Sequence, residues 1–318
     1  MVKEEKNIKN NVYESIIVGG GPAGLTAGLY LSRYRVNTLL IEKGISGGQV
    51  NLSETIENYP GFPEGIIGPE LMQRFEEQAT KFGLKIVNST VLEISQEQHE
   101  NKTNFKISTT DRDFYSKSVI IASGGEASKL GVPGEIELTG RGVSYCGTCD
   151  GAFFRDKEIV VVGGGDTALE EALFLTKYAS KVTIVHRRDE LRGSKILQER
   201  VFNNPKINLK WSNIVLSIDG KTQVESLQLK NVKTGEIITF SCQGVFIFAG
   251  YKPIYPSLGE LKERLVNDSG YIITDDNMET EIKGIFACGD VRAKSLRQVV
   301  TACGEGATAA FSVELFLK

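Results

Sequence analysis

The sequence predicts an α/β protein in which one unit of strand, glycine-rich turn, helix and strand occurs twice. Each of two glycine-rich turns, at residues 19–24 and 163–168, follows a short apolar strand and precedes an apolar-periodic helix. The chain has 318 residues, and at roughly 100–200 residues per domain this length favours two domains. We therefore expect an α/β chain with two domains, one around each glycine turn.

Composition excludes several classes of protein. Lys and Arg number 37 against 40 Asp and Glu, so the net charge of −3 offers no basic excess for nucleic acid or an anionic membrane. No apolar run reaches the roughly 18 residues of a membrane span, and residues 1–11 lack an apolar targeting segment. Five cysteines do not make a secreted disulfide framework. We expect a cytoplasmic protein without nucleic-acid or membrane partners.

The first turn matches the pattern G-x-G-x-x-G between a strand at residues 14–18 and a helix to about Tyr34. This pattern allows a pyrophosphate to approach the backbone at a helix N-terminus. Glu42 ends a second strand, expected at residues 38–42, close to the offset at which a carboxylate accepts hydrogen bonds from an adenosine ribose. The turn predicts dinucleotide binding in a Rossmann-like domain, with a glycine-rich packing turn as the alternative. The candidate residues are Gly19, Gly21, Pro22, Ala23, Gly24 and Glu42.

The second turn has the same spacing but ends in alanine. A helix to about Tyr178 is expected after it, and the strand at residues 181–185 leads into three arginines and a histidine. Alternating Val, Ile and Thr residues predict antiparallel strands around residues 106–121 and 209–248. Arginines hold a 2′-phosphate through charge-assisted hydrogen bonds, whereas a carboxylate would repel it. The second turn therefore predicts an NADPH site. A solvated charged turn is the alternative, because Asp189 and Glu190 dilute the positive field. The candidate residues are Gly163, Gly165, Asp166, Thr167, Ala168, His186, Arg187, Arg188 and Arg192.

A third signal lies near the C-terminus. A short apolar strand ends in Gly289-Asp290, and a helix is expected to begin around Arg297, Gln298 and Val299. Asp290 can accept hydrogen bonds from ligand hydroxyls, and the helix N-terminus offers N–H groups to an electron-rich ring. Glycines within this helix indicate a face pressed against another backbone or a flat ligand.

Cys146 and Cys149 form a C-x-x-C pair just before the second unit. Half of a zinc site and two inert core thiols are the alternatives to a redox pair that exchanges with partner disulfides. Zinc would require further ligands, yet the other cysteines stand singly and the chain has two histidines, so we expect no metal. Asp150 is adjacent and is either a general acid for the leaving thiolate or a helix-capping carboxylate.

Several of these motifs together resemble the low-molecular-weight bacterial thioredoxin reductases. The resemblance runs from about residue 14 to the end, and Cys-x-Thr-Cys-Asp-Gly joined to His-Arg-Arg is its most specific part. The C-terminus carries no cysteine, unlike the larger animal-type reductases, and residues 123–126 depart from the Ala-Thr-Gly-Ala of the family. The matching segments are Gly19–Gly24, Gly47–Gln49, Glu57–Gly61, Cys146–Gly151, Gly163–Ala168, His186–Arg192, Gly289–Asp290 and Arg297–Gln298.

The resemblance implies a fold and a reaction. Two Rossmann-like three-layer (β/β/α) domains would be present, with an NADPH domain at 122–249 inserted into an FAD domain at 1–121 and 250–318. Electrons would pass as hydride from NADPH to FAD, then to the disulfide and to thioredoxin, with Cys149 facing the flavin, Cys146 attacking thioredoxin and Asp150 supplying the proton. The FAD contacts would further include Gly47, Gly48, Gln49, Asn58, Gly289, Asp290, Arg297, Gln298 and Val299.

The dithiol and the nicotinamide site belong to the same domain, but both must reach the flavin that the other domain holds. We therefore expect residues 122–249 to rotate about the two crossings between the domains, and the family implies a homodimer. Two other functions stay open. The same machinery could take electrons from NADH or reduced ferredoxin, or the disulfide could act as a redox sensor without turnover.

Overall fold

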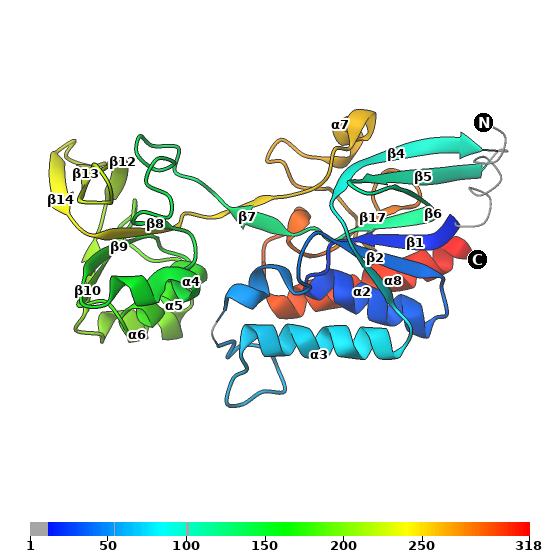
Figure 1. Cartoon of the computed structure of the whole chain (residues 1–318), viewed down its shortest axis with the longest axis horizontal. Coiled ribbons are helices and arrows are strands. Elements are labelled where there is room, and N and C mark those ends of the chain that lie inside the picture. Colours follow the sequence, from blue (N-terminus) through cyan, green and yellow to red (C-terminus); the bar gives the residue numbers. More distant parts are fainter. Residues whose placement is uncertain (1–11, 54, 100–101) are drawn as a thin grey trace. The chain divides into compact units, whose positions relative to one another are not determined.

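The computed structural model describes residues 12–53, 55–99 and 102–318 (Figure 1). The chain forms two compact units. Unit 1 comprises Met1–Glu126 and Lys252–Lys318, and unit 2 comprises Ala127–Tyr251. These divisions lie at residues 126/127 and 251/252, whereas the sequence placed the domain boundaries after residues 121 and 249.

Unit 1 is built on a seven-stranded sheet in the order β3-β2-β1-β6-β5-β4, with β17 also paired to β6. The pairs β3–β2, β2–β1, β1–β6 and β6–β17 are parallel, whereas β6–β5 and β5–β4 are antiparallel. The elements are β1 (Val12–Val18), α2 (Pro22–Arg33), β2 (Thr38–Glu42), η1 (Gly48–Leu52), α3 (Gly68–Lys81), β3 (Lys85–Asn88), β4 (Val91–His99), β5 (Lys102–Thr109), β6 (Asp113–Ile121), η3 (Gly259–Leu261), α7 (Lys262–Leu265), β17 (Ile285–Ala287), η4 (Gly289–Val291) and α8 (Val299–Leu317).

The central parallel strands β1, β2 and β17 of unit 1 bury apolar side chains on both faces, as their apolar sequences require. Ile17 and Leu40 pack with α2, α3 and α8 on one face. Ile16 and Leu39 pack on the other face against the antiparallel strands and the segment around Leu265. Unit 1 therefore has three layers, as the sequence predicted.

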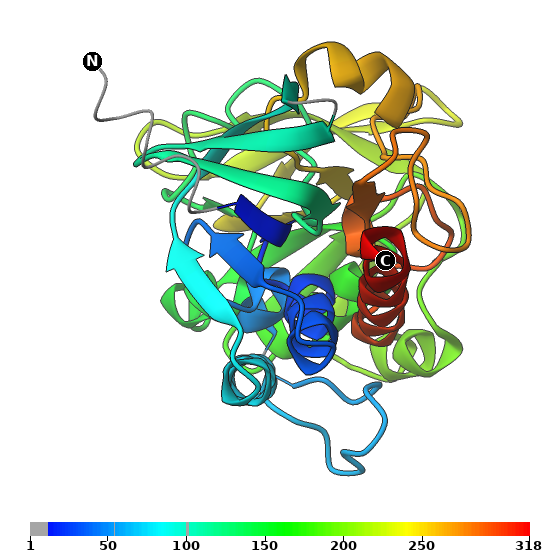
Figure 2. The ribbon, with the colours of Figure 1, turned by 90° about the vertical axis from the view of Figure 1, so that its right-hand side faces the viewer.

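Helix α8 packs beside α2 in unit 1 (Figure 2). A Cβ at Gly306 would lie 2.3 Å from the backbone oxygen of Ala23, so the glycine lets the two helix backbones meet. This is the close backbone approach that the glycines of this segment predicted. By length and composition alone α8 is apolar enough to cross a membrane, but its residues from Ala302 to Val313 contribute to the core of unit 1.

Unit 2 repeats the arrangement with a five-stranded parallel sheet, β11-β10-β9-β15-β8. Helices α5 and α6 cover one face, and the antiparallel sheet β12-β13-β14 covers the other. The elements are β8 (Val143–Ser144), α4 (Gly147–Asp150), η2 (Gly151–Phe154), β9 (Glu158–Gly163), α5 (Asp166–Leu175), β10 (Lys181–Val185), α6 (Lys195–Phe202), β11 (Ile207–Lys210), β12 (Asn213–Asp219), β13 (Ser226–Asn231), β14 (Ile237–Ser241) and β15 (Gly244–Phe248).

The expected boundaries of two segments in unit 2 are wrong. Antiparallel structure was expected over residues 209–248, but β11 and β15 belong to the parallel sheet, because alternating Val and Ile residues suit either kind of strand. The helix expected to reach Tyr178 ends at Leu175, since Thr176, Lys177 and Tyr178 each donate their N–H to the carbonyl three residues earlier.

The chain passes between the two units twice, and the two passages pair as a short sheet of β7 (Gly125–Ala127) and β16 (Tyr251–Pro253). A glycine with positive φ precedes each strand, Gly124 at 68° and Gly250 at 121°. The N–H of Ile254 donates to the carbonyl of Gly124 at 3.0 Å, and Ser123 Oγ donates to the carbonyl of Ile254. Glycines thus stand where both passages change direction.

Candidate active site

The first glycine turn joins β1 to α2 and brings the chain ends of several elements together. Gly19 has a φ of 107°, and a Cβ at Gly24 would lie 1.9 Å from the Gly19 carbonyl oxygen, so this turn closes only with glycine at both positions. A Cβ at Gly21 would meet nothing within 4 Å. Space is therefore open beside the turn at the N-terminus of α2, where Pro22 and Ala23 begin the helix.

Residues from two later segments lie against this turn. Glu42 at the end of β2 accepts the N–H of Gly20 at 2.6 Å. The N–H of Gly47 donates to the carbonyl of Gly20 at 2.8 Å, and a Cβ at Gly48 would lie 3.6 Å from Gly21. These contacts place the predicted Glu42 and the Gly47–Gly48 pair, followed by the exposed Gln49, at one edge of the sheet.

The C-terminal segment reaches the same edge. A Cβ at Gly289 would lie 2.8 Å from the Ala23 side chain, so η4 packs on the start of α2. Gln298 is the N-cap of α8, which begins at Val299, and its Oε1 accepts a hydrogen bond from Asn58 Nδ2 at 3.1 Å. The Arg297 guanidinium lies 4.2 Å from the ring centroid of Tyr271. The structure thus brings Asn58 and Gln298, which lie 240 positions apart, into contact.

Two polar atoms of this site are buried without a hydrogen-bond partner, Asp290 Oδ1 and Arg297 Nε. Lys294 Nζ lies 3.1 Å from Asp290 Oδ1 and forms an ion pair with it, but the geometry makes no hydrogen bond. Buried polar atoms without partners are rare in proteins and indicate a missing ligand or ordered water. Together with the open space at Gly21, they fit a dinucleotide whose hydroxyls and ring atoms meet these residues.

The second glycine turn repeats this design in unit 2. A Cβ at Gly165 would meet nothing within 4 Å, as at Gly21. Asp166 begins α5 and accepts the N–H of Ser194 at 2.6 Å, and Thr167 and Ala168 follow it in the first turn of the helix. The N–H of Arg192 donates to the carbonyl of Gly164 at 2.7 Å, which holds the predicted Arg192 beside the turn.

His186 occupies the place that Glu42 has in unit 1, since a Cβ at Gly164 would lie 2.5 Å from its ring. The ring is 5% exposed, and burial, followed by the charge of Arg192, lowers the pKa of His186. The ring is therefore neutral at pH 7, and its Nε2 has no hydrogen-bond partner. A buried orphan nitrogen beside an open turn fits a second nucleotide.

The charges of the three arginines that follow β10 are accessible to solvent and to a ligand. Arg187, Arg188 and Arg192 are exposed. Asp189, which the sequence suggested would dilute their field, is paired elsewhere: it accepts a hydrogen bond from Ser212 Oγ and forms an ion pair with Lys233. Lys233 and then Ser212 lower the pKa of Asp189, so the carboxylate is ionised and its charge is balanced by a lysine.

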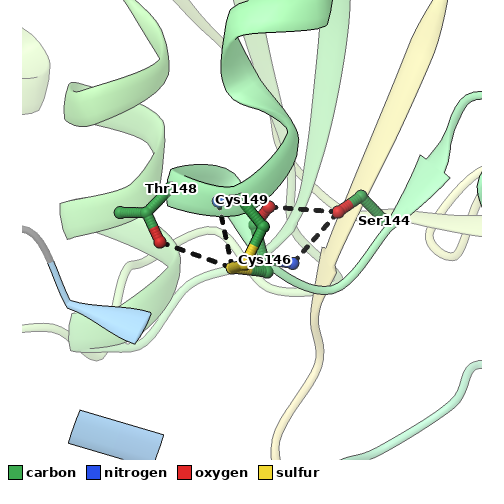
Figure 3. Close-up of a disulfide and its surroundings, with 4 residues drawn as sticks. All are labelled: Ser144, Cys146, Thr148 and Cys149. Atoms are coloured by element: carbon green, nitrogen blue, oxygen red, sulfur yellow. Dashed lines mark hydrogen bonds between the residues drawn. A yellow bond between two sulfur atoms is a disulfide. The ribbon is translucent and has the colours of Figure 1, made fainter. Parts of the chain in front are cut away.

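Cys146 and Cys149 form a disulfide at the start of α4 (Figure 3). Cys146 is the N-cap of this helix, and its Sγ accepts the N–H of Cys149 at 3.2 Å. Thr148 Oγ1 lies 3.3 Å from the same sulfur, and the buried Ser144 hydroxyl bonds both the N–H and the carbonyl of Cys146. Hydrogen bonds at a helix N-terminus stabilise a thiolate, so the geometry favours Cys146 as the nucleophile of the reduced pair.

The three cysteines outside the C-x-x-C pair are free thiols that burial keeps protonated. Burial raises the pKa of the Cys242 thiol to about 12, and it also raises the pKa values of Cys288 and Cys303. Within the residues that the structure describes, no group of three or more His, Cys, Asp or Glu side chains could hold a metal ion. Asp150 precedes η2 at its N-cap position but makes no capping hydrogen bond, which removes the capping role for this carboxylate.

Two carboxylates near the site were missed by the sequence. Glu305 on α8 accepts the N–H of Gly289 at 2.8 Å and pairs with Arg292 and Lys294. Glu171 on α5 lies behind Gly147, in the middle of the disulfide motif. Glu171 is four residues before the buried Leu175, so helical spacing placed it on the buried face. That spacing was the available signal.

Two nucleotide-type glycine turns and a C-x-x-C disulfide define a two-domain disulfide oxidoreductase of the α/β nucleotide-binding class. The chain belongs to the pyridine nucleotide-disulphide oxidoreductase family, whose pattern it matches over residues 13–306, and within it to the low-molecular-weight bacterial thioredoxin reductases. Membership confirms the fold class and the redox role of the cysteine pair, and it implies a flavin and a pyridine nucleotide.

The similarity extends over nearly the whole chain. A thioredoxin reductase of Bacillus subtilis is 48% identical over 98% of this chain and 96% of its own length. One from Peptoclostridium acidaminophilum is 46% identical over 97% and 98%. A crystal structure of a Lactococcus lactis thioredoxin reductase, in a conformation designated FR, has a TM-score of 0.92 at 47% identity and covers 96% of this chain and 99% of that one.

Proposed function

We propose that the protein reduces the disulfide of a thioredoxin with electrons from NADPH, passed through FAD bound in unit 1. The observation that carries the proposal is the Cys146–Cys149 disulfide at the N-terminus of α4. Relatives that are 46% and 48% identical over nearly the full length are thioredoxin reductases, which supports a thioredoxin as the partner. When bound, FAD and NADPH supply the two electrons that open the disulfide.

Residues of each unit would hold one of the nucleotides. In unit 1 we assign FAD to the Gly19–Gly24 turn, Glu42, Gly47–Gln49, Asn58, Gly289–Asp290 and Arg297–Val299, because the orphan atoms of Asp290 and Arg297 need partners. In unit 2 we assign NADPH to the Gly163–Ala168 turn, His186 and the three arginines. The exposed guanidinium groups support the phosphorylated nucleotide, since each charge-assisted hydrogen bond contributes about 1.5–3 kcal/mol.

The cysteines perform the exchange in two steps. Two electrons and one proton convert the disulfide to a Cys146 thiolate and a Cys149 thiol. The Cys146 thiolate then attacks one sulfur of the thioredoxin disulfide, which releases the other thioredoxin sulfur as a thiolate. After the Cys149 thiol has lost its proton to the released thioredoxin thiolate, the Cys149 thiolate attacks Cys146 Sγ in the mixed disulfide, which reforms Cys146–Cys149 and releases the second thioredoxin thiolate. Asp150, which does not serve as a cap, is assigned the transfer of protons to the departing thiolates.

The proposal includes a change of pose between the half-reactions. Residues 122–249 would rotate about the two passages, supported by the glycines with positive φ at 124 and 250. An engineered disulfide that joins the two units should stop turnover and leave one half-reaction intact, and turnover that survives the lock would exclude rotation.

We also propose a cytoplasmic homodimer. The family resemblance supports the dimer, and apolar side chains exposed on α2 and α8, among them Tyr30, Val300 and Phe311, offer surface for a partner copy. Sedimentation equilibrium measures this directly, and a mass equal to one chain at micromolar protein would contradict it.

The test of the function is an anaerobic titration followed by a coupled assay. We expect NADPH to bleach the bound flavin and about two equivalents to complete the reduction, one for FAD and one for the disulfide. With oxidised thioredoxin present, catalytic amounts of enzyme should then oxidise NADPH over many turnovers. Cys146→Ser should retain flavin bleaching and lose thioredoxin reduction.

Two results would each overturn part of the proposal. Bleaching by dithionite but by neither NADPH nor NADH would favour a ferredoxin-type donor. Bleaching by NADPH without turnover of any thioredoxin would favour a redox sensor.

A further inference from the structure

Glu171 is a carboxyl group packed against the backbone of the redox motif. A Cβ at Gly147 would lie 2.0 Å from Glu171 Oε2. With a bond of about 1.5 Å from Cα to Cβ, Oε2 lies within about 3.5 Å of the Gly147 Cα, and Cα atoms of neighbouring residues are about 3.8 Å apart. The carboxyl oxygen is therefore within about 7 Å of the Cα of Cys146.

This carboxyl has fewer partners than a buried charge needs. Oε2 is buried and has no hydrogen-bond partner. Burial raises the pKa of Glu171 to about 7, the backbone N–H of Gly147 opposes this rise, and the charge of Glu170 adds to it. The side chain therefore changes charge near neutral pH, directly behind the helix turn that holds the disulfide.

Few other charges act on this carboxyl. The charge of Glu170 is the one that affects its pKa, and the lysine on β10 is paired with the glutamate on β9 at 3.7 Å. The titratable residues on α5 and on the elements packed against it are Asp166 and Glu170 on α5, Cys146, Cys149 and Asp150 at α4, Lys195, Glu199 and Arg200 on α6, Glu158 on β9 and Lys181 on β10.

We propose that Glu171 is a positioning residue of the redox pair, whose protonation state sets how readily Cys146 exists as a thiolate. An ionised Glu171 repels a thiolate at Cys146 and attracts the same α4 amides that would stabilise it. A protonated Glu171 does neither. Reduction of the disulfide to a thiolate and a thiol therefore favours uptake of a proton by Glu171, and the proton returns to solvent when the disulfide reforms.

The size of the effect follows from Coulomb's law. Because the sulfur lies beyond the Cα, the two charges are about 7 to 10 Å apart. Their repulsion corresponds to roughly twofold in the thiolate-to-thiol ratio at about 10 Å and an effective dielectric constant of about 80, and to roughly fiftyfold at about 7 Å and about 20. The neutral variant Glu171→Gln should raise that ratio by a factor within this range at pH 8, where the wild-type carboxyl is ionised.

The test measures the alkylation rate of Cys146 by iodoacetamide between pH 5 and pH 10. It uses the flavin-bound, full-length Cys149→Ser protein, without nucleotide or thioredoxin, and peptide mass spectrometry assigns the modified cysteine. We expect two titration steps with Glu171 present and one step, at lower pH, in Glu171→Gln. Glu171→Asp, which keeps the charge, should retain both steps.

Glu170→Gln is the matched control, because it removes the same charge one position away on the exposed side of α5. The inference would be overturned if the alkylation rate of Cys146 depended on pH in the same way with Glu171 as with Glu171→Gln. It would also be overturned if Glu170→Gln shifted that pH dependence as much as Glu171→Gln does. The inference rests on the proposed function, yet this assay needs no reductase turnover. A failed thioredoxin assay with a shifted alkylation profile would refute only the function, and the reverse outcome would refute only the role of Glu171.

Discussion

The stability of unit 2 should depend on pH through Glu171. Its pKa lies at about 7 in the folded protein against 4.5 for an unperturbed glutamate. The folded state therefore binds this proton more tightly than the unfolded state, so the penalty is absent below pH 4.5, grows as pH rises to about 7 and stays constant above it. At about 1.4 kcal/mol for each pH unit, the full penalty is about 3 kcal/mol.

Glu171→Gln removes this penalty because the amide does not ionise. We expect the free energy of unfolding of the variant, relative to wild type, to increase by about 2.5 kcal/mol between pH 5 and pH 8. Taking the difference between two pH values cancels any effect of the amide that does not depend on pH.

Urea unfolding, monitored by tryptophan fluorescence, measures the free energy of unfolding of unit 2. Trp211 is the only tryptophan of the chain and packs on the core that α5 shares. Glu170→Gln serves as the control and should run nearly parallel to wild type. Parallel curves for wild type and Glu171→Gln from pH 5 to pH 8 would show that the carboxyl is not buried as described and would refute the argument.

Three further outcomes are expected. Ala at both Arg187 and Arg188 should raise the KM for NADPH at least tenfold and leave that for NADH nearly unchanged, measured by steady-state kinetics; an equal rise for both would contradict a 2′-phosphate site. Gly165→Val should keep the melting temperature of the nucleotide-free protein, since its side chain meets nothing within 4 Å, and weaken NADPH binding in calorimetry. Gly306→Val should lower thermal stability by several degrees, because its Cβ would lie 2.3 Å from the Ala23 oxygen, and an unchanged melting curve would contradict that contact.

The parts of the fold that the sequence predicts best are those with a local physical cause. The strand at residues 38–42 and the strand at residues 181–185 are found where expected, because each is a short apolar run bounded by turns. The glycine turns are equally local, since their spacing follows from the backbone geometry of one turn. Strand direction over residues 209–248 was predicted less well, because pairing is decided by distant chain.

The contacts that complete the candidate site come from distant parts of the sequence. Asn58 and Gln298 each belong to a recognisable motif, but their hydrogen bond depends on the packing of α8 beside α2. Glu305 has no motif at all and is found only because α8 carries it to the N–H of Gly289. Local spacing can nominate such residues, whereas tertiary packing decides which of them meet.

The two glycine turns differ in the side chain that supports their middle glycine. In unit 1, Gly20 contacts a carboxylate, Glu42, which accepts its N–H. In unit 2, Gly164 contacts the ring of His186, whose lowered pKa keeps it neutral. A carboxylate at this place favours ribose hydroxyls and repels a phosphate, whereas a neutral ring beside arginines accepts one. The same backbone turn is thus supported by a carboxylate at the end of β2 in unit 1 and by the imidazole that follows β10 in unit 2, which is the difference expected if the two turns bind different nucleotides.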